Sequence, residues 1–221
     1  MTTLDRADIT AGILAELDTF GELIRPLDAT ALDTPTRCAG WTVRDVAGHM
    51  VGQMTDVVEG RLDGLGGPEA TARQARERAG RSGPELADEL AAARARSAEM
   101  LGLFDDAAWN GPVSSDFDGT IGEGVHALWF DGYVHADDIR AALGMPPVRT
   151  PGLNASIHYA ARDLTQRGWG PGTLALDGVD VVDVGGGGEK VSGDPYAFLL
   201  ATTGRADPSP LGLDERVNIF G

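Results

Sequence analysis

Residues 129–140, with the sequence WFDGYVHADDIR, decide both the expected fold and the expected chemistry of this chain. Asp131 and His135 lie four positions apart in this stretch, within a predicted helix from about residue 121 to residue 143. Side chains at this spacing are neighbours on one helix face, with Cβ atoms roughly 5–6 Å apart, close enough to bind one ion. The stretch therefore predicts a helix that presents a carboxylate and an imidazole together.

A third potential ligand lies in another segment predicted to be helical. Thr42 is followed three residues later by Asp45, a spacing typical of a helix N-cap, and His49 lies about two turns further on. Two histidines and one carboxylate would leave open positions on a divalent metal. If the two helices meet in a bundle, His49, Asp131 and His135 form a metal site. The alternative is that Asp131 and His135 only bond to each other, and that His49 is a satisfied core histidine.

Apolar periodicity predicts two further long helices. One lies between residues 4 and 27, where apolar side chains recur at three- and four-residue steps. The other begins at Ser82, a capping serine followed three residues later by Glu85. Residues 60–83 are rich in Gly, Arg and Glu, so we expect an exposed, mobile connection that is at most partly helical near its end. Four helices joined by loops favour a bundle.

The sequence pattern changes after Pro151. Short apolar runs around the turn Asp177-Gly178 indicate strands, and helical patterns lie on both sides of them. The predicted elements are a helix at 153–167, strands at 173–176 and 179–184, and a helix at 194–203. We therefore expect an α+β protein: a four-helix bundle at residues 1–148 followed by a small α+β domain at residues 149–221.

Composition excludes several classes of partner. The formal net charge of -16 would repel nucleic acid and anionic membrane surfaces. The chain has neither a signal-peptide pattern nor an apolar run of about 18 residues, which predicts a protein that is not exported and not membrane-spanning. Cys38 is the single cysteine, so a reducing cytoplasm is the expected compartment. With no histidine near it in sequence, Cys38 is predicted to be a small buried hydrophobe rather than a nucleophile.

Three segments resemble one known family. Residues 36–50, TRCAGWTVRDVAGHM, resemble the pattern T-x-C-x-G-W-S/T-V-x-D-V/I/L-x-x-H-L/M of the mycothiol-dependent maleylpyruvate isomerase family, in the DinB-like helical-bundle superfamily. Residues 131–144 are similar to its E-x-x-x-H-x-x-D-I/L-x-x-A-x-G segment, and residues 191–205 to its G-x-P-x-x-L-L-x-x-x-x-G-R segment. The resemblance spans nearly the whole chain, and it implies a DinB-like bundle with a smaller C-terminal α+β domain.

The resemblance implies a metal site and a thiol cofactor. The ligands of the family fall on His49, Asp131 and His135, with zinc as the first expectation and nickel, cobalt, manganese or iron as alternatives. Asp131 replaces the usual glutamate. Because aspartate is one methylene shorter, its helix must approach the ion more closely, or the carboxylate binds differently, or a water bridges the gap. The implied cofactor is mycothiol.

Two further residues are candidates near this site. Asp138 shares a helix face with Asp131 and His135, so it either orients His135 as a hydrogen-bond acceptor or pairs with a nearby arginine. The resemblance places an arginine of the C-terminal region near substrate, and Arg205 is the residue that would fill this catalytic role by clamping a carboxylate. A surface position for Arg205 is the alternative.

The resemblance implies a metal- and mycothiol-dependent enzyme that acts on a small electrophilic substrate. If the thiol adds to a conjugated double bond and is expelled after rotation, the result is cis/trans isomerisation; if the adduct is kept, the result is S-transfer. A non-catalytic binding or regulatory member of the family and a metal-dependent hydrolase remain as alternatives. The expected partners are a small-molecule thiol and its substrate, and the expected assembly is a monomer or a homodimer.

Overall fold

Capped helix starts organise the N-terminal part of the chain. The structure is a computed structural model that describes residues 4–113 and 117–221. In it, Thr42, Ser82 and Thr120 each accept a hydrogen bond from the backbone three residues on, where an acidic side chain accepts one in return. These capping boxes satisfy N–H groups that the start of a helix otherwise leaves unpaired. The predicted starts at Thr42 and Ser82 are confirmed.

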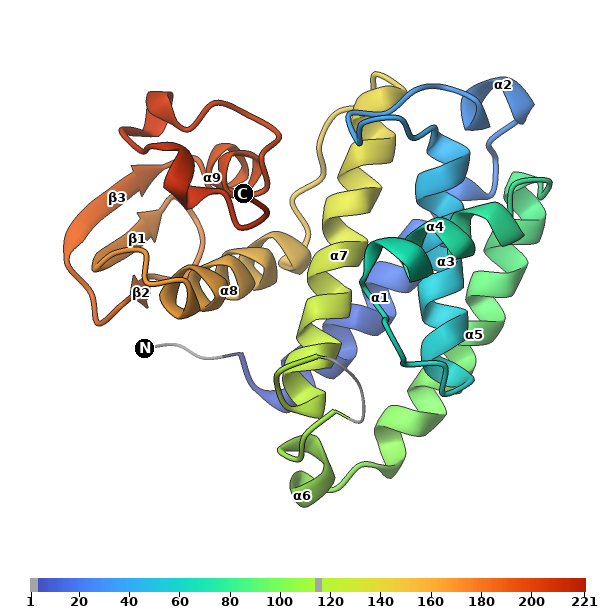
Figure 1. Cartoon of the computed structure of the whole chain (residues 1–221), viewed down its shortest axis with the longest axis horizontal. Helices are drawn as coiled ribbons and strands as arrows, with labels where there is room; N and C mark the ends of the chain where they lie inside the picture. Colours follow the sequence, from blue (N-terminus) through green and yellow to red (C-terminus); the bar gives the residue numbers. More distant parts are fainter. Residues whose placement is uncertain (1–3, 114–116) are drawn as a thin grey trace. The chain divides into compact units, whose positions relative to one another are not determined.

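Four long helices form a bundle (Figure 1). They are α1 (Arg6–Ile24), α3 (Val43–Val58), α5 (Gly83–Leu103) and α7 (Ile121–Ala142), with the shorter α2 (Ala29–Leu32), α4 (Pro68–Glu77) and α6 (Asp106–Trp109) in the connections. Helix α3 packs against both α5 and α7. In α1 the periodic apolar positions are all buried, as the spacing predicts: Ile9, Ile13, Leu17, Phe20, Leu23 and Ile24.

The chain divides into two compact units. One spans residues 9–148 and contains the bundle; the other contains residues 149–221 together with the N-terminal segment as far as Asp8. Residues 1–3 and 114–116, which the predicted N-terminal domain includes, lie outside the described residues. None of the helices in the described part of the chain is long and apolar enough to cross a membrane.

Helix α4 differs from the sequence-based expectation. Residues 60–83 were expected to be an exposed connection, but α4 forms within them and packs closely against α3. Glycines on α3 permit this approach: a Cβ atom at Gly52 would lie 2.6 Å from Gln74 Cβ, and one at Gly48 would lie 3.2 Å from Arg78 Cβ. Because real Cβ contacts are longer than the first distance, α4 can dock here only against a bare backbone.

The C-terminal unit combines helices with one small sheet. Its elements are α8 (Pro151–Gln166), β1 (Gly172–Leu176), β2 (Val182–Val184), β3 (Glu189–Gly193), α9 (Pro195–Thr202) and the 3₁₀ turns Ser209–Leu211 and Glu215–Val217. The strand order is β2-β1-β3: β1 pairs antiparallel with β2 and parallel with β3, and α8 packs against β2 and α9. The predicted α+β class is confirmed.

Strand β3 was not predicted. Its sequence EKVSG has no buried residue, so it lacks the apolar alternation by which a half-buried strand is recognised. It forms because it pairs with the central strand β1 along five residues. The two strands that were predicted, β1 and β2, do show this alternation: every second residue is buried in each of them.

Candidate metal centre

Two helices of the bundle bring the three predicted ligands together. His49 lies in the first half of α3, and Asp131 and His135 lie one turn apart on α7. The Asp131 carboxylate lies between the two imidazoles, with Oδ2 3.5 Å from His49 Nε2 and Oδ1 3.4 Å from His135 Nε2. One ligand atom from each residue lies within 4.8 Å of the others. The side chains therefore share one small volume.

The contacts of the two imidazoles differ between their ring nitrogens. Both Nε2 atoms lie farther from Asp131 than the 2.7–3.2 Å typical of N–H···O hydrogen bonds. The Nδ1 atoms have close partners: Gln74 Oε1 at 2.8 Å for His49, and Asp138 Oδ2 at 2.9 Å for His135. Each imidazole is thus held by Nδ1 and directs Nε2 toward Asp131, a common arrangement for histidine ligands.

Charge is concentrated between Asp131 and His135. Burial opposes ionisation of Asp131, but the positive charge of His135 and the interactions with His49 and Gln53 outweigh it and lower the pKa of Asp131 to about 2. Burial also opposes protonation of His135, yet the charge of Asp131 and the hydrogen bond to Asp138 raise its pKa to about 10. A cation that bound both residues would therefore take the place of the His135 proton.

Asp138 supports His135 from behind. It is fully buried, and its Oδ1 accepts a hydrogen bond from Arg37 Nε at 2.5 Å while its Oδ2 lies 2.9 Å from His135 Nδ1. The same arginine also pairs with Asp137. Both roles considered for Asp138, acceptor from His135 and partner of an arginine, are thus present together. Arg37 thus provides a cationic partner for a carboxylate that is buried away from solvent.

Cys38 lies closer to the site than its sequence position indicated. It is half-buried, and its Sγ donates to Asp138 Oδ2 at 3.2 Å. Together with His135 and Asp138 it forms a second group whose ligand atoms lie within 4.8 Å of one another. The prediction that Cys38 is a small buried hydrophobe was therefore wrong: its thiol is only half-buried and makes a hydrogen bond, and His135, which is distant in sequence, lies close to it in the fold.

Gln53 adds a polar group on the same face of α3. It is buried one turn after His49, and its side chain forms a hydrogen bond that helps to lower the pKa of Asp131. Its Oε1 is buried and has no hydrogen-bond partner within the described residues. Gln53 therefore brings a buried, unsatisfied hydrogen-bond acceptor to the face of α3 that carries His49.

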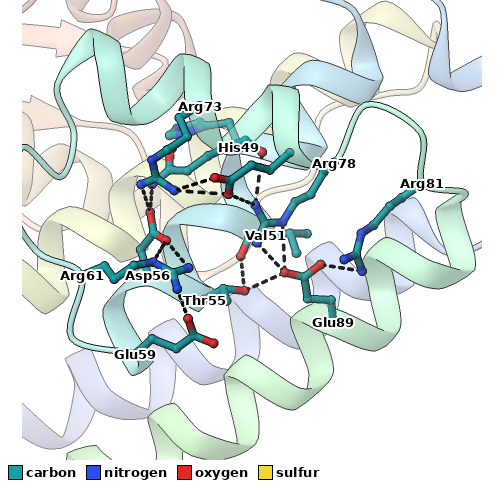
Figure 2. A network of polar contacts seen from close by, with 12 residues as sticks. His49, Val51, Thr55, Asp56, Glu59, Arg61, Arg73, Arg78, Arg81 and Glu89 are labelled. Atoms are coloured by element: carbon teal, nitrogen blue, oxygen red, sulfur yellow. Dashed lines mark hydrogen bonds and ion pairs between the residues drawn. The ribbon is translucent and has the colours of Figure 1, made fainter.

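A second group of polar residues lies behind His49 and was not predicted. Helix α4 contributes Gln74, which is fully buried and bridges His49 to Asp56 with its Nε2 at 2.7 Å from Asp56 Oδ2. Figure 2 shows Asp56 between Arg61 and Arg73, both of which donate to it. Arg73 and Gln74 were missed because the segment that carries them was expected to be an exposed connection, helical at most near its end.

Arg205 lies in the C-terminal unit, just after α9. Its Nη1 donates to the backbone oxygen of Thr203 at 3.1 Å. Its role in binding a substrate carboxylate stays a prediction from the sequence.

Comparison with known proteins gives a consistent result. Residues 13–140, more than half of the chain, match the family described as "Mycothiol maleylpyruvate isomerase N-terminal domain". A crystal structure of the mycothiol-dependent maleylpyruvate isomerase is similar over 93% of both chains, with 18% identity and a TM-score of 0.63. A histidine-to-alanine mutant of that enzyme is similar over the same shares, with 19% identity and a TM-score of 0.60. At this identity the structures show a shared fold, and no curated protein sequence matches this chain.

Proposed function

The chain belongs to the mycothiol maleylpyruvate isomerase N-terminal domain family, and from that premise we propose that it is a divalent-metal-dependent, mycothiol-dependent isomerase or S-transferase. Its substrate would be a small molecule with an electrophilic carbon, of which maleylpyruvate, named for the structural neighbour, is one example. Zinc is the first metal to test, followed by nickel, cobalt, manganese and iron.

The convergence of His49, Asp131 and His135 carries this proposal. A zinc ion bound at 2.0–2.1 Å in tetrahedral geometry separates its ligand atoms by about 3.3–3.4 Å. Each imidazole Nε2 lies 3.4 or 3.5 Å from a different oxygen of Asp131, beyond ordinary hydrogen-bond distance, and one ligand atom from each residue lies within 4.8 Å of the others, which is compact enough for one ion. The donor set also fits, since two imidazoles and one carboxylate leave at least one position open for a reactant.

Each residue of the proposed site would have its own role. A divalent ion held by the three side chains would favour the thiolate form of a bound thiol, which is the nucleophilic form. Asp131 supplies the negative charge that compensates the cation, and Asp138 holds the ring of His135 through Nδ1. Gln53 offers its buried Oε1 to a donor on a reactant. We also propose that Arg205 binds a substrate carboxylate, because guanidinium and carboxylate match in shape and charge.

Metal content is the first test. Protein purified without added metal is analysed for bound zinc, nickel, cobalt, manganese and iron, and its melting temperature is measured with each metal added. We expect about one ion per chain in the wild type, and loss of the ion with an intact fold in His49→Ala and His135→Ala. His158→Ala is the matched control and keeps the metal, because His158 bonds to Asp180 in the C-terminal unit. Cys38→Ser also keeps it, since Cys38 belongs to the second group and not to the proposed ligands.

Thiol dependence is the second test. Turnover of maleylpyruvate is followed by absorbance with and without mycothiol, before and after removal of metal by a chelator. We expect turnover only with both present. Wild-type protein that holds no stoichiometric metal and melts unchanged with every metal would overturn the enzyme assignment in favour of a binding or regulatory protein. Thiol-independent hydrolysis of esters or amides would overturn it in favour of a hydrolase.

A further inference from the structure

The starting point is a buried carboxylate that lies away from the proposed metal ligands. Asp56 on α3 is fully buried and accepts hydrogen bonds from Arg61 Nε at 2.8 Å, Arg73 Nη2 at 2.6 Å and Gln74 Nε2 at 2.7 Å. Burial opposes ionisation, but these donors outweigh it and lower the pKa of Asp56 below its ordinary value. At neutral pH Asp56 is therefore an acceptor only.

An acceptor at Asp56 decides which way the amide of Gln74 points. The Nε2 of Gln74 donates to Asp56, so its Oε1 lies on the other side, 2.8 Å from His49 Nδ1. The reverse orientation would bring two oxygens to 2.7 Å from each other beside an ionised carboxylate, with no proton between them. The amide orientation thus follows from the charge on Asp56 and not from the fit of Gln74 alone.

The orientation of Gln74 in turn decides which ring nitrogen of His49 carries the proton. A carbonyl oxygen accepts only, so the 2.8 Å contact favours a proton on Nδ1 when the ring is neutral, and the 3.5 Å between Nε2 and the Asp131 carboxylate is too long for a competing hydrogen bond. The Nε2 atom, which lies toward Asp131, is then left with its lone pair free. Trp41 packs edge-on against the same ring, with centroids 5.8 Å apart, and limits its rotation.

We propose that Gln74, oriented by Asp56, is a positioning residue that holds His49 in the Nδ1–H form and so presents Nε2 as a ligand before any metal arrives. The inference rests on the proposed function for the identity of the ligand. Asp138 does the equivalent for His135, so each histidine of the site would have its own partner at Nδ1. The two partners lie on different helices. Asp138 is on α7, which also carries Asp131 and His135, whereas Gln74 is on the short helix α4, which carries none of the proposed ligands.

The test reads the protonated nitrogen directly in metal-free protein. Two-bond nitrogen–proton NMR spectra of ¹⁵N-histidine-labelled protein, at about pH 8 where an ordinary imidazole is neutral, distinguish the two forms. We expect the Nδ1–H form for His49 in the wild type and a shift to the Nε2–H form in Gln74→Leu, which cannot accept a hydrogen bond. In Asp56→Asn the amide of Gln74 is free to turn, so a mixture of both forms is expected. The Nε2–H form in the wild type would overturn the proposal without any variant having to fold.

A matched control separates positioning from simple loosening of α4. Arg78→Met removes the ion pair between Arg78, the residue that caps the C-terminal end of α4, and Glu89 on α5, but leaves the Gln74 side chain in place. We expect the Nδ1–H form of His49 to persist in this variant. If Arg78→Met shifted His49 as far as Gln74→Leu does, docking of α4 and not the Gln74 oxygen would be responsible, and the proposal would be wrong.

Metal affinity supplies the second measurement. Competition with a chromophoric chelator should show zinc binding weaker by roughly 10–100-fold in Gln74→Leu, the usual cost of losing such a partner, and nearly unchanged in Arg78→Met. Equal affinity in Gln74→Leu and wild type would overturn the positioning role. If the wild type bound no metal, the proposed function would fail, whereas the tautomer measurement on metal-free protein would still decide the role of Gln74 and Asp56.

Discussion

Asp131 lies between two imidazoles, at a position where the family pattern has the longer glutamate. Its oxygens lie 3.5 Å and 3.4 Å from the Nε2 atoms of His49 and His135. Closer approach of its helix, a different mode of carboxylate binding and a bridging water are the three ways in which this aspartate could replace the glutamate of the family pattern. If the three residues hold one ion, we expect the aspartate to reach it without a longer side chain.

Asp131→Glu should therefore bind zinc no more tightly than the wild type. The added methylene has to fit between imidazoles that are each held at Nδ1, and overfilling a packed site usually costs about 1–3 kcal/mol. Competition with a chromophoric chelator measures the affinity, and Asp131→Asn, equal in shape but uncharged, should bind far more weakly. Tighter binding by the glutamate variant would show that the aspartate is too short.

The helices that the sequence predicts correctly are those whose signals, capping residues and apolar periodicity, lie within a few residues of one another in the chain. Thr42 and Ser82 each cap a helix through an acidic residue three positions later, and α1 shows its apolar period within one segment. The same local patterns placed His49, Asp131 and His135 on their helices. What local patterns could not give is the partner of each side chain, because Arg37 and Cys38 meet Asp138 across about a hundred residues of sequence.

Helix α4 was missed for a related physical reason. Its sequence PEATARQARE has few large apolar residues, and only Ala70, Gln74 and Ala75 are buried. Such a short polar helix is marginal alone, so its stability must come from packing against α3 and from ion pairs. The signals that could have found it are Pro68 at the first helical position and Glu69 in the first turn.

Asp56→Asn tests how much the ion pairs of Asp56 contribute to the free energy of unfolding. Removing one partner of a buried pair costs about 3–5 kcal/mol, but Arg61 and Arg73 are partly exposed and can turn to water, so we expect a loss of about 2 kcal/mol at pH 7. Folding lowers the pKa of Asp56 below its ordinary value of 3.8. The stability that ionised Asp56 adds to the wild type is therefore fully present well above pH 3.8. It is lost as the pH falls through 3.8 toward the pKa of Asp56 in the folded protein.

Urea unfolding at a series of pH values from 7 to about 3 measures both effects. Asp88→Asn is the charge-matched control: Asp88 pairs with Arg25 at an exposed position, so its loss should cost less than about 1 kcal/mol. An Asp56→Asn penalty that equals that of the control, or that stays constant down to pH 3, would contradict the expectation.

At the scale of the whole molecule, the proposed ligands and the proposed substrate arginine belong to different units. His49, Asp131 and His135 all lie within residues 9–148, and Arg205 lies within residues 149–221. Metal binding and substrate binding should therefore respond to different substitutions. The net charge of -16 gives a further reason for a dedicated cation, since an anionic substrate is repelled by the protein at long range.

Arg205→Met should leave metal content unchanged and raise KM for a carboxylate substrate by roughly 10–100-fold, the value of one charge-assisted hydrogen bond. Steady-state kinetics with metal analysis of the same samples checks this, and Arg205→Lys should recover part of the loss. Arg216→Met is the control, because Arg216 is exposed in the same unit and pairs with its neighbour Asp214. Loss of metal in Arg205→Met, or an unchanged KM, would contradict the assignment.

Gly52 also determines which related sequences can be built in the same way. Any side chain at this position would place its Cβ 2.6 Å from Gln74 Cβ, so a homologue with alanine or a larger residue there cannot dock a helix at the distance seen for α4. Such a homologue needs another acceptor for the histidine at the position of His49. Without one, the proton of that imidazole can lie on either ring nitrogen. We therefore expect the residue at this one position to show, from sequence alone, whether a relative can hold the counterpart of His49, the proposed ligand, in the way seen here.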